Sequence, residues 1–326
     1  MIINSIKPFE GNHCETTATG TLLNQNNIFL SEPMLFGIGE GLGFIFWNMK
    51  SMDFPFFGGR IKPDILTQNI TKHLKLKLDV VETSSNKRAW NDVKHLLDNE
   101  IVVGIKLDCY YLEYFSKPFH FAGHYIALYG YDNKNVYLID TKQQGIKVKT
   151  SLESFAKARS AKGSMSSKNM YYTINKTSKT YDIKEIIIAA IRNNAKAYIN
   201  PPIQNIGYKG IFKASNEIIK WFNLSNNIEN EFIQCANLME KAGTGGSLFR
   251  NIYRDFLKES YDILNVELLN KSYIEFIEIA NLWKDVSKLF YKTGKTKNIK
   301  YLMEASEILK RISEREKEIM EELSRI

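Results

Sequence analysis

Residues 123–140 read GHYIALYGYDNKNVYLID, with two runs rich in aromatic and β-branched residues on either side of a polar turn. This pattern is typical of an antiparallel β-hairpin. A three-residue loop centred on Asp132 would place His124 directly across from Asp140, with their Cβ atoms roughly 4.5–5.5 Å apart. The carboxylate could then accept a hydrogen bond from the imidazole and fix its tautomer. A slip of one residue would put the two side chains on opposite faces.

A candidate nucleophile, Cys14, lies in the segment GNHCETT at 11–17, immediately before a run that favours a helix. The orphan N–H groups and the macrodipole of a helix N-terminus stabilise a thiolate. A thiol with a histidine beside it and a carboxylate behind the histidine is an activated nucleophile. We therefore predict a catalytic triad of Cys14, His124 and Asp140. A buried inert cysteine and a structural histidine are the alternatives.

The residues around this triad have weaker predictions. Asn12 is a candidate helix cap or oxyanion donor. His120 precedes the strand pattern and is the weaker candidate for the base. The chain has three cysteines, so they cannot all pair, and their spacing matches no zinc pattern. Cys109 and Cys235 are predicted to be packing residues, and no metal site and no cofactor are expected.

The pattern of apolar and polar residues changes at about residue 176. The first part mixes short apolar runs with turn residues and predicts α and β structure. The second part consists of long periodic segments separated by short polar breaks and predicts helices. The sequence therefore predicts an α+β fold with domains at 1–176 and 177–326. Expected strands are 101–107, 124–130, 136–140 and 170–174, and expected helices are 15–23, 65–74, 87–97, 183–193, 214–221, 229–242, 248–265, 271–290 and 298–324.

Composition narrows the class of protein. Of 326 residues, 44% are hydrophobic, which suffices for a folded core. No apolar run reaches the roughly 18–20 residues that a membrane span needs, and the first ten residues do not resemble a secretory signal, so we expect a cytoplasmic protein without a membrane partner. The net charge of +8 favours an acidic partner, and no nucleic-acid motif is present.

Two glycine-rich segments are candidate ligand-binding sites. The run GIGEGLG at 37–43 lacks the Lys-Ser/Thr of a nucleotide loop. It is predicted to let the backbone pack closely beside the helix that carries the nucleophile, and the alternative is that Gly39, Glu40 and Gly41 line an acyl channel.

The other segment, GTGGSLFR, ends at Arg250. Ser247 could cap the following helix, and Arg250 and Arg254 would share one face, which suits the phosphate of a pantetheine arm or a substrate carboxylate. The alternative is a connector whose arginines pair with Asp255 or Glu259.

The segments around Cys14, the run 37–43, and Gly123-His124-Tyr125 through Asp140-Thr141 resemble the N-terminal domain of the butirosin biosynthesis protein H family. The resemblance continues through Asn200-Pro201-Pro202, residues 207–221 and residues 243–250. That N-terminal domain is similar to papain-like peptidases of the bacteriocin-processing (C39) type. The resemblance implies a papain-like, cysteine-peptidase-like catalytic domain at 1–176 and an all-α domain at 177–326 that acts as a partial lid or docks a carrier.

The resemblance also implies a function: a cysteine-dependent N-acyltransferase, or amide synthase, of natural-product biosynthesis. It would take an acyl group from the phosphopantetheine thioester of an acidic acyl or peptidyl carrier protein and pass it, through a Cys14 acyl-enzyme, to a small amine. Closthioamide-type amide synthases, which use a diamine, are candidate closer relatives. The alternatives are a cytoplasmic cysteine peptidase or amidase, and a non-catalytic binding module on a peptidase fold.

Overall fold

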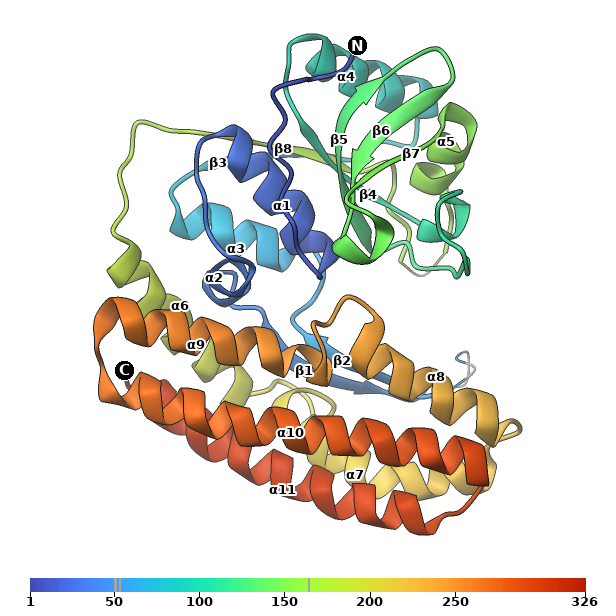
Figure 1. The fold of residues 1–326 in the computed structure, drawn as a ribbon, viewed down its shortest axis with the longest axis vertical. Coiled ribbons are helices and arrows are strands. Elements are labelled where there is room, and N and C mark those ends of the chain that lie inside the picture. Colours follow the sequence, from blue (N-terminus) through green and yellow to red (C-terminus); the bar gives the residue numbers. More distant parts are fainter. Residues whose placement is uncertain (50–51, 53, 164) are drawn as a thin grey trace. The chain divides into compact units, whose positions relative to one another are not determined.

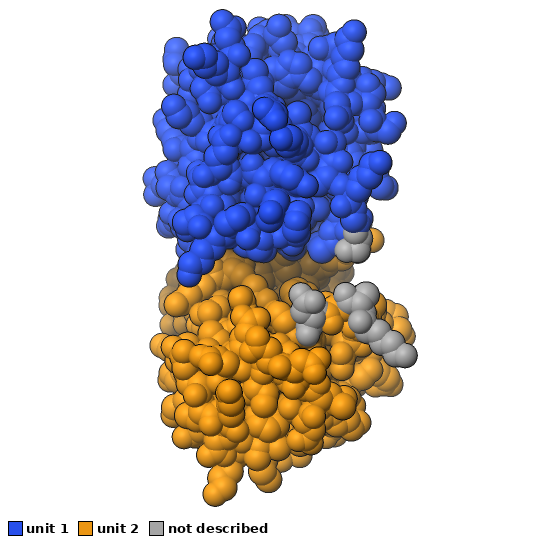
Figure 2. All heavy atoms as spheres, turned by 90° about the vertical axis from the view of Figure 1, so that its right-hand side faces the viewer, with its two compact units in different colours: residues 1–35, 63–181 blue, residues 36–62, 182–326 orange. Residues whose placement is uncertain are grey.

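A computed structural model describes residues 1–49, 52, 54–163 and 165–326 (Figure 1). The chain forms two compact units, coloured separately in Figure 2. Unit 1 is Met1–Leu35 with Pro63–Tyr181, and unit 2 is Phe36–Lys62 with Asp182–Ile326. Unit 1 mixes helices and strands and unit 2 is mainly helical, so the α+β class is confirmed.

Unit 1 is built on a six-stranded antiparallel sheet in the order β3-β8-β4-β5-β6-β7. Its strands are β3 (Lys77–Val81), β4 (Val103–Leu107), β5 (His124–Tyr131), β6 (Asn135–Ile139), β7 (Lys147–Ser151) and β8 (Tyr171–Asn175). Its longer helices are α1 (Cys14–Gln25), α3 (Ile65–His73), α4 (Asn86–Asp98) and α5 (Leu152–Ser160). Two short 3₁₀ turns, η1 (Cys109–Tyr111) and η2 (Lys142–Gln144), lie between β4 and β5 and between β6 and β7. All the strands and helices expected here are present.

Adjacent residues of β8 show how the helices cover the sheet. Tyr172 reaches Thr19 of α1, with 3.4 Å between the hydroxyl oxygens, whereas Tyr171 donates a 3.1 Å hydrogen bond to Asp92 of α4. Neighbouring strand residues point to opposite faces, so α1 and α4 lie on opposite sides of the sheet. Thr67 of α3 joins α1 through a 2.8 Å contact with Thr19.

The β5–β6 hairpin forms as predicted, but its register differs by two residues. Ala127 lies opposite Ile139, so His124 is not directly opposite Asp140. Between the last paired residues, Tyr131 and Val136, the turn has four residues rather than three, and a one-residue β-bulge falls at Tyr129. The longer turn alone would send His124 and Asp140 to opposite faces, and the extra residue of the bulge returns them to the same face.

Unit 2 consists of long helices and a two-stranded sheet. Its helices are α6 (Ile183–Ile199), α7 (Gly207–Leu224), α8 (Ile228–Lys241), α9 (Arg250–Leu264), α10 (Glu267–Thr296) and α11 (Lys300–Leu323), with the short 3₁₀ turn η3 (Ser247–Phe249). Each of the six segments predicted to be helical after residue 181 falls on one of these helices. The sheet pairs β1 (Leu42–Trp47) with β2 (Phe56–Arg60).

This small sheet corrects the predicted domain limits. Residues 36–62 belong to unit 2, the chain returns to unit 1 at Pro63, and the last change of unit follows Tyr181 rather than residue 176. The reason is the burial of apolar side chains against α10, which carries Trp283 and Phe290. The ring centroids of Phe44 and Trp283 are 5.5 Å apart, and those of Phe57 and Phe290 are 5.7 Å apart. The alternation of buried residues along β1 turns one face of the hairpin onto the helices.

The glycine run ends a helix that begins in unit 1 and continues into unit 2. Helix α2 (Glu32–Ile38) closes with hydrogen bonds from the Glu40 and Gly41 amides to the carbonyls of Gly37 and Phe36, and Glu40 takes a left-handed φ of 55°. A Cβ on Gly37 would lie 2.1 Å from the ring of Phe256, so the predicted close packing is against α9 and not against α1. A channel lined by Gly39, Glu40 and Gly41 stays a prediction.

Candidate active site

The centre of the site is a buried histidine–carboxylate pair. The Nε2 atom of His124 lies 2.8 Å from Oδ2 of Asp140. His124 is 7% exposed and Asp140 is fully buried. His124 opens β5 and Asp140 follows the last residue of β6, so the hairpin fixes both backbones.

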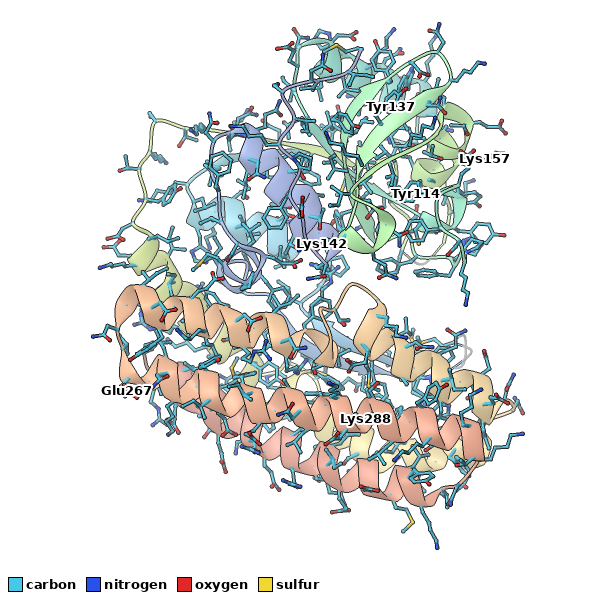
Figure 3. All side chains as sticks on the ribbon, in the orientation of Figure 1. Tyr114, Tyr137, Lys142, Lys157, Glu267 and Lys288 are labelled. Carbon is cyan, nitrogen blue, oxygen red and sulfur yellow. The ribbon has the colours of Figure 1, made fainter. Side chains whose placement is uncertain are left out.

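Asp140 receives further hydrogen bonds. The Thr141 amide donates to Oδ1 at 2.7 Å, and the Tyr114 hydroxyl donates to Oδ2 at 2.8 Å. Burial, reinforced by Asp140, raises the pKa of Tyr114 well above its usual value, which keeps this residue a neutral donor. Tyr114 (labelled in Figure 3) was not identified from the sequence, because it is one of several aromatic residues in a loop without periodicity.

Cys14 is the first residue of α1 and hydrogen-bonds to His124. Because Asp140 engages Nε2, the second ring nitrogen, Nδ1, is the one that remains for the thiol. Burial lowers the pKa of His124, but the charge and hydrogen bond of Asp140, together with Cys14, outweigh burial and raise it to about 10. The imidazole is therefore protonated at neutral pH and forms the positive partner of the Asp140 carboxylate.

The loop before Cys14 is held by an acidic residue that the sequence analysis missed. The Glu32 carboxylate accepts hydrogen bonds from the amides of Asn12 and His13 at 2.8 Å, from the Asn12 side chain at 2.9 Å, and from the Thr16 hydroxyl at 2.9 Å. A carboxylate at a helix N-terminus stabilises it. Glu32 therefore fixes the position from which Cys14 projects.

The same contacts correct one prediction. Asn12 does not cap α1, whose N-cap residue is His13 without a side-chain cap hydrogen bond. The Asn12 side chain donates to Glu32, and its role toward an oxyanion stays a prediction. Gly11 is required here, because a Cβ would lie 2.5 Å from Thr17 Oγ1. Its carbonyl accepts a 2.9 Å hydrogen bond from the Lys142 amide, which ties this loop to the segment after Asp140.

The two other cysteines are buried thiols, at 0% and 1% exposure for Cys109 and Cys235. Burial raises the pKa of both. His120 instead pairs with Asp108, at 2.9 Å, and its side chain is 64% exposed. Within the described parts of the chain, no group of three or more His, Cys, Asp or Glu residues could hold a metal ion. The described helices also include none that is long and apolar enough to span a bilayer.

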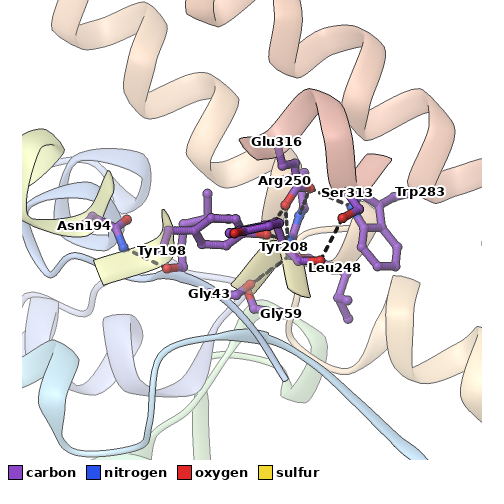
Figure 4. Close-up of polar contacts among 11 residues, drawn as sticks. Gly43, Gly59, Asn194, Tyr198, Tyr208, Leu248, Arg250, Trp283, Ser313 and Glu316 are labelled. Atoms are coloured by element: carbon purple, nitrogen blue, oxygen red, sulfur yellow. Dashed lines mark hydrogen bonds and ion pairs between the residues drawn. The ribbon is translucent and has the colours of Figure 1, made fainter. Parts of the chain in front are cut away.

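The predicted phosphate site at Arg250 is wrong. Arg250 is fully buried within unit 2, where it makes two 2.8 Å hydrogen bonds to Glu316 (Figure 4). Both side chains are 0% exposed, so this guanidinium cannot bind a phosphate. Arg254 pairs with Asp255 at 2.7 Å, as the connector alternative predicted.

Ser247 is not the predicted helix cap. The N-cap residue of α9 is Phe249, and no side-chain cap hydrogen bond is present there. Ser247, Leu248 and Phe249 have φ angles of 48°, 49° and 73°, which place three successive residues in the left-handed region. The Leu248 carbonyl accepts a 2.8 Å hydrogen bond from Arg250, so the buried arginine holds this unusual backbone.

The charge state of His124 gives a testable prediction. Asp140→Asn removes the carboxylate that raises the pKa of His124, while the burial that lowers it remains, so the pKa should fall from about 10 to below 6.5. In the wild type, the raised pKa stabilises the folded protein most below pH 6.5, and this stabilisation is lost as the pH rises toward 10. NMR titration of the imidazole nitrogens measures the change. A His124 that titrates near 6.5 in both proteins would contradict the proposed ion pair.

Two family models match the chain. One is described as butirosin biosynthesis protein H, N-terminal, and matches residues 13–141. This range begins one residue before Cys14 and ends one residue after Asp140. The other is described as a domain of unknown function (DUF4872) and matches residues 153–323. A search of curated proteins found no match.

Proposed function

The chain belongs to the DUF4872 family and its first half matches the butirosin biosynthesis protein H N-terminal model, and from this premise we propose a cysteine-dependent N-acyltransferase of natural-product biosynthesis. One observation carries the chemistry: a thiol at a helix start, hydrogen-bonded to an imidazole that a buried carboxylate holds at 2.8 Å. The arrangement supports nucleophilic catalysis by Cys14. The proposal includes a papain-like (C39-type) relationship for the catalytic domain.

In the first half-reaction, the Cys14 thiolate attacks the carbonyl carbon of an acyl thioester. The tetrahedral intermediate collapses, the C–S bond of the donor breaks, and the departing thiolate takes the proton from His124. The Cys14 amide is among the first N–H groups of α1, which have no partner within the helix, and it could donate to the oxyanion. The product is an acyl-enzyme.

In the second half-reaction, an amine attacks the acyl-enzyme and gives its proton to neutral His124. Cys14 leaves as a thiolate, and the product amide departs. Asp140 orients the imidazole in both steps and stabilises its protonated form. Tyr114 and Thr141 hold Asp140 in place.

The substrates belong to the same proposal. The donor would be a phosphopantetheine thioester on an acidic carrier protein, which the net charge of +8 would attract. The acceptor would be a small amine, such as the diamine of closthioamide-type synthases. The helical second half would dock the carrier or act as a partial lid.

The test is incubation of the protein with an acyl thioester, with and without amine, followed by mass spectrometry of the products. We expect a Cys14 acyl adduct without amine and an amide with it. Free acid alone at saturating amine would instead identify a peptidase or amidase. No adduct and no turnover with any thioester would favour a binding module.

A further inference from the structure

The loop that precedes His124 is unusually rich in rings. We call residues 110–121 the aromatic loop, since in 12 positions it carries seven aromatic side chains. These are Tyr110, Tyr111, Tyr114, Phe115, Phe119, His120 and Phe121. Apart from Tyr114, none of them has a role in the chemistry described above.

A buried carboxylate ties both ends of this loop together. Asp108, at 4% exposure, accepts hydrogen bonds from the Tyr110 amide at 3.1 Å, the Phe121 amide at 2.9 Å and the His120 ring at 2.9 Å. The Cys109 thiol adds a 3.3 Å hydrogen bond to the Phe119 carbonyl. The aromatic loop is therefore a fixed structure and not a loose connection.

The rings form a continuous row that starts at the catalytic imidazole. The Phe115 ring meets the His124 ring edge to face, with 5.5 Å between centroids. Phe119 follows at 6.3 Å from Phe115, and Phe121 at 6.4 Å from Phe119. Phe119 is 49% exposed. Packed rings thus link His124, through Phe115, to Phe119, which is the most exposed of these rings.

The charges around this row select its ligand. The Asp108 carboxylate already accepts hydrogen bonds from the loop, such as that from the Phe121 amide. The Glu113 carboxylate accepts hydrogen bonds from Ser151 and Ser154. A protonated His124 at the inner end would repel an ammonium group. Neither carboxylate is thus available to hold a charged amine, whereas a flat apolar group would find ring faces and edges.

We propose that the aromatic loop binds the acyl group of the donor and selects aromatic or bulky apolar acyl chains, with Phe119 at the outer end of the site. This inference rests on the proposed function, because it places the acyl group beside Cys14 and His124. It predicts that Phe119 determines acyl specificity without taking part in the chemistry.

The experiment compares two alkylating probes, 2-chloroacetamide and N-benzyl-2-chloroacetamide, on the full-length protein. Peptide mass spectrometry gives the rate at Cys14, and each rate is divided by that of the same probe with N-acetylcysteine. We expect the normalised rate of the benzyl probe to exceed that of 2-chloroacetamide about tenfold in the wild type. In Phe119→Ala this ratio should be about fivefold smaller. The Phe119 carbonyl that binds Cys109 survives this substitution.

Phe29→Ala is the matched control. Phe29 is 59% exposed, lies in the same unit and contacts Lys7, with 5.2 Å from its ring centroid to the lysine nitrogen. This variant should keep the full preference for the benzyl probe. A wild type without the preference, or Phe119→Ala with an undiminished one, would overturn the inference.

Failure of the proposed function has a different signature. In that case Cys14 would react no faster than the free thiol with either probe. The aromatic loop would then be tested by the binding of unreactive N-benzylacetamide. Binding is followed through the NMR resonances of the His124 ring. A shift in the wild type that is lost in Phe119→Ala supports the inference, and no shift in the wild type overturns it.

Discussion

Cys14→Ala and His124→Ala are each expected to lower turnover by at least about 10⁴-fold, because nucleophile and base act as one unit. The thiol has no substitute, since Cys109 and Cys235 are buried and burial raises the pKa of both. Cys14→Ala should also form no acyl adduct. Amide production from a thioester and an amine, measured by mass spectrometry, checks both variants.

Cys235→Ala is the control for this prediction. It removes a buried thiol from α8 of unit 2, in a helix that contributes nothing to the triad. It should therefore keep turnover within about twofold of the wild type. Cys14→Ala with activity within tenfold of the wild type would end the proposed mechanism.

The histidine–carboxylate pair could be predicted because its two partners lie in one hairpin. Alternation of residue types and a short turn restrict the geometry, even though the predicted register was wrong by two residues. A bulge at Tyr129 has no local signature, yet it decides which face His124 occupies. The prediction still placed both residues on one face, because it missed both the extra turn residue and the bulge. Each of these alone would change the face, and together they cancel.

The other features depend on contacts between distant parts of the chain. Glu32 binds the Asn12 amide across 20 positions, and Tyr114 reaches Asp140 across 26. Nothing in the local pattern distinguishes these two residues from other polar and aromatic side chains. In the same way, residues 36–62 belong to unit 2 because their apolar side chains are buried there, and the periodicity of the sequence does not indicate this.

Arg250 is the clearest case of a local pattern that misled. Its spacing from Arg254 suggested one basic face of a helix, but its partner Glu316 lies 66 positions away on α11. Glu316 accepts two hydrogen bonds from Arg250, one from the Tyr198 hydroxyl and one from the Trp283 indole at 2.9 Å. Burial lowers the pKa of Arg250, but Glu316 and Tyr198 outweigh it and raise it, so the guanidinium remains charged.

The guanidinium also binds three backbone carbonyls. Its Nη1 atom lies 3.1 Å from the Gly43 oxygen, 3.4 Å from that of Gly59 and 2.8 Å from that of Leu248 (Figure 4). Arg250 thereby joins β1, β2 and the left-handed turn η3 to the helices of unit 2. Removal of its counter-charge would leave a buried cation at the junction of all these elements.

Glu316→Gln is therefore expected to destabilise unit 2 by about 3–5 kcal/mol, since it leaves Arg250 buried without a compensating carboxylate. The control is Glu322→Gln, the same change on the same helix, where the Lys271 partner is 60% exposed and the expected loss is below about 1 kcal/mol. Urea unfolding followed by tryptophan fluorescence measures both. Equal losses in the two glutamine variants would show that the buried pair does not hold unit 2 together.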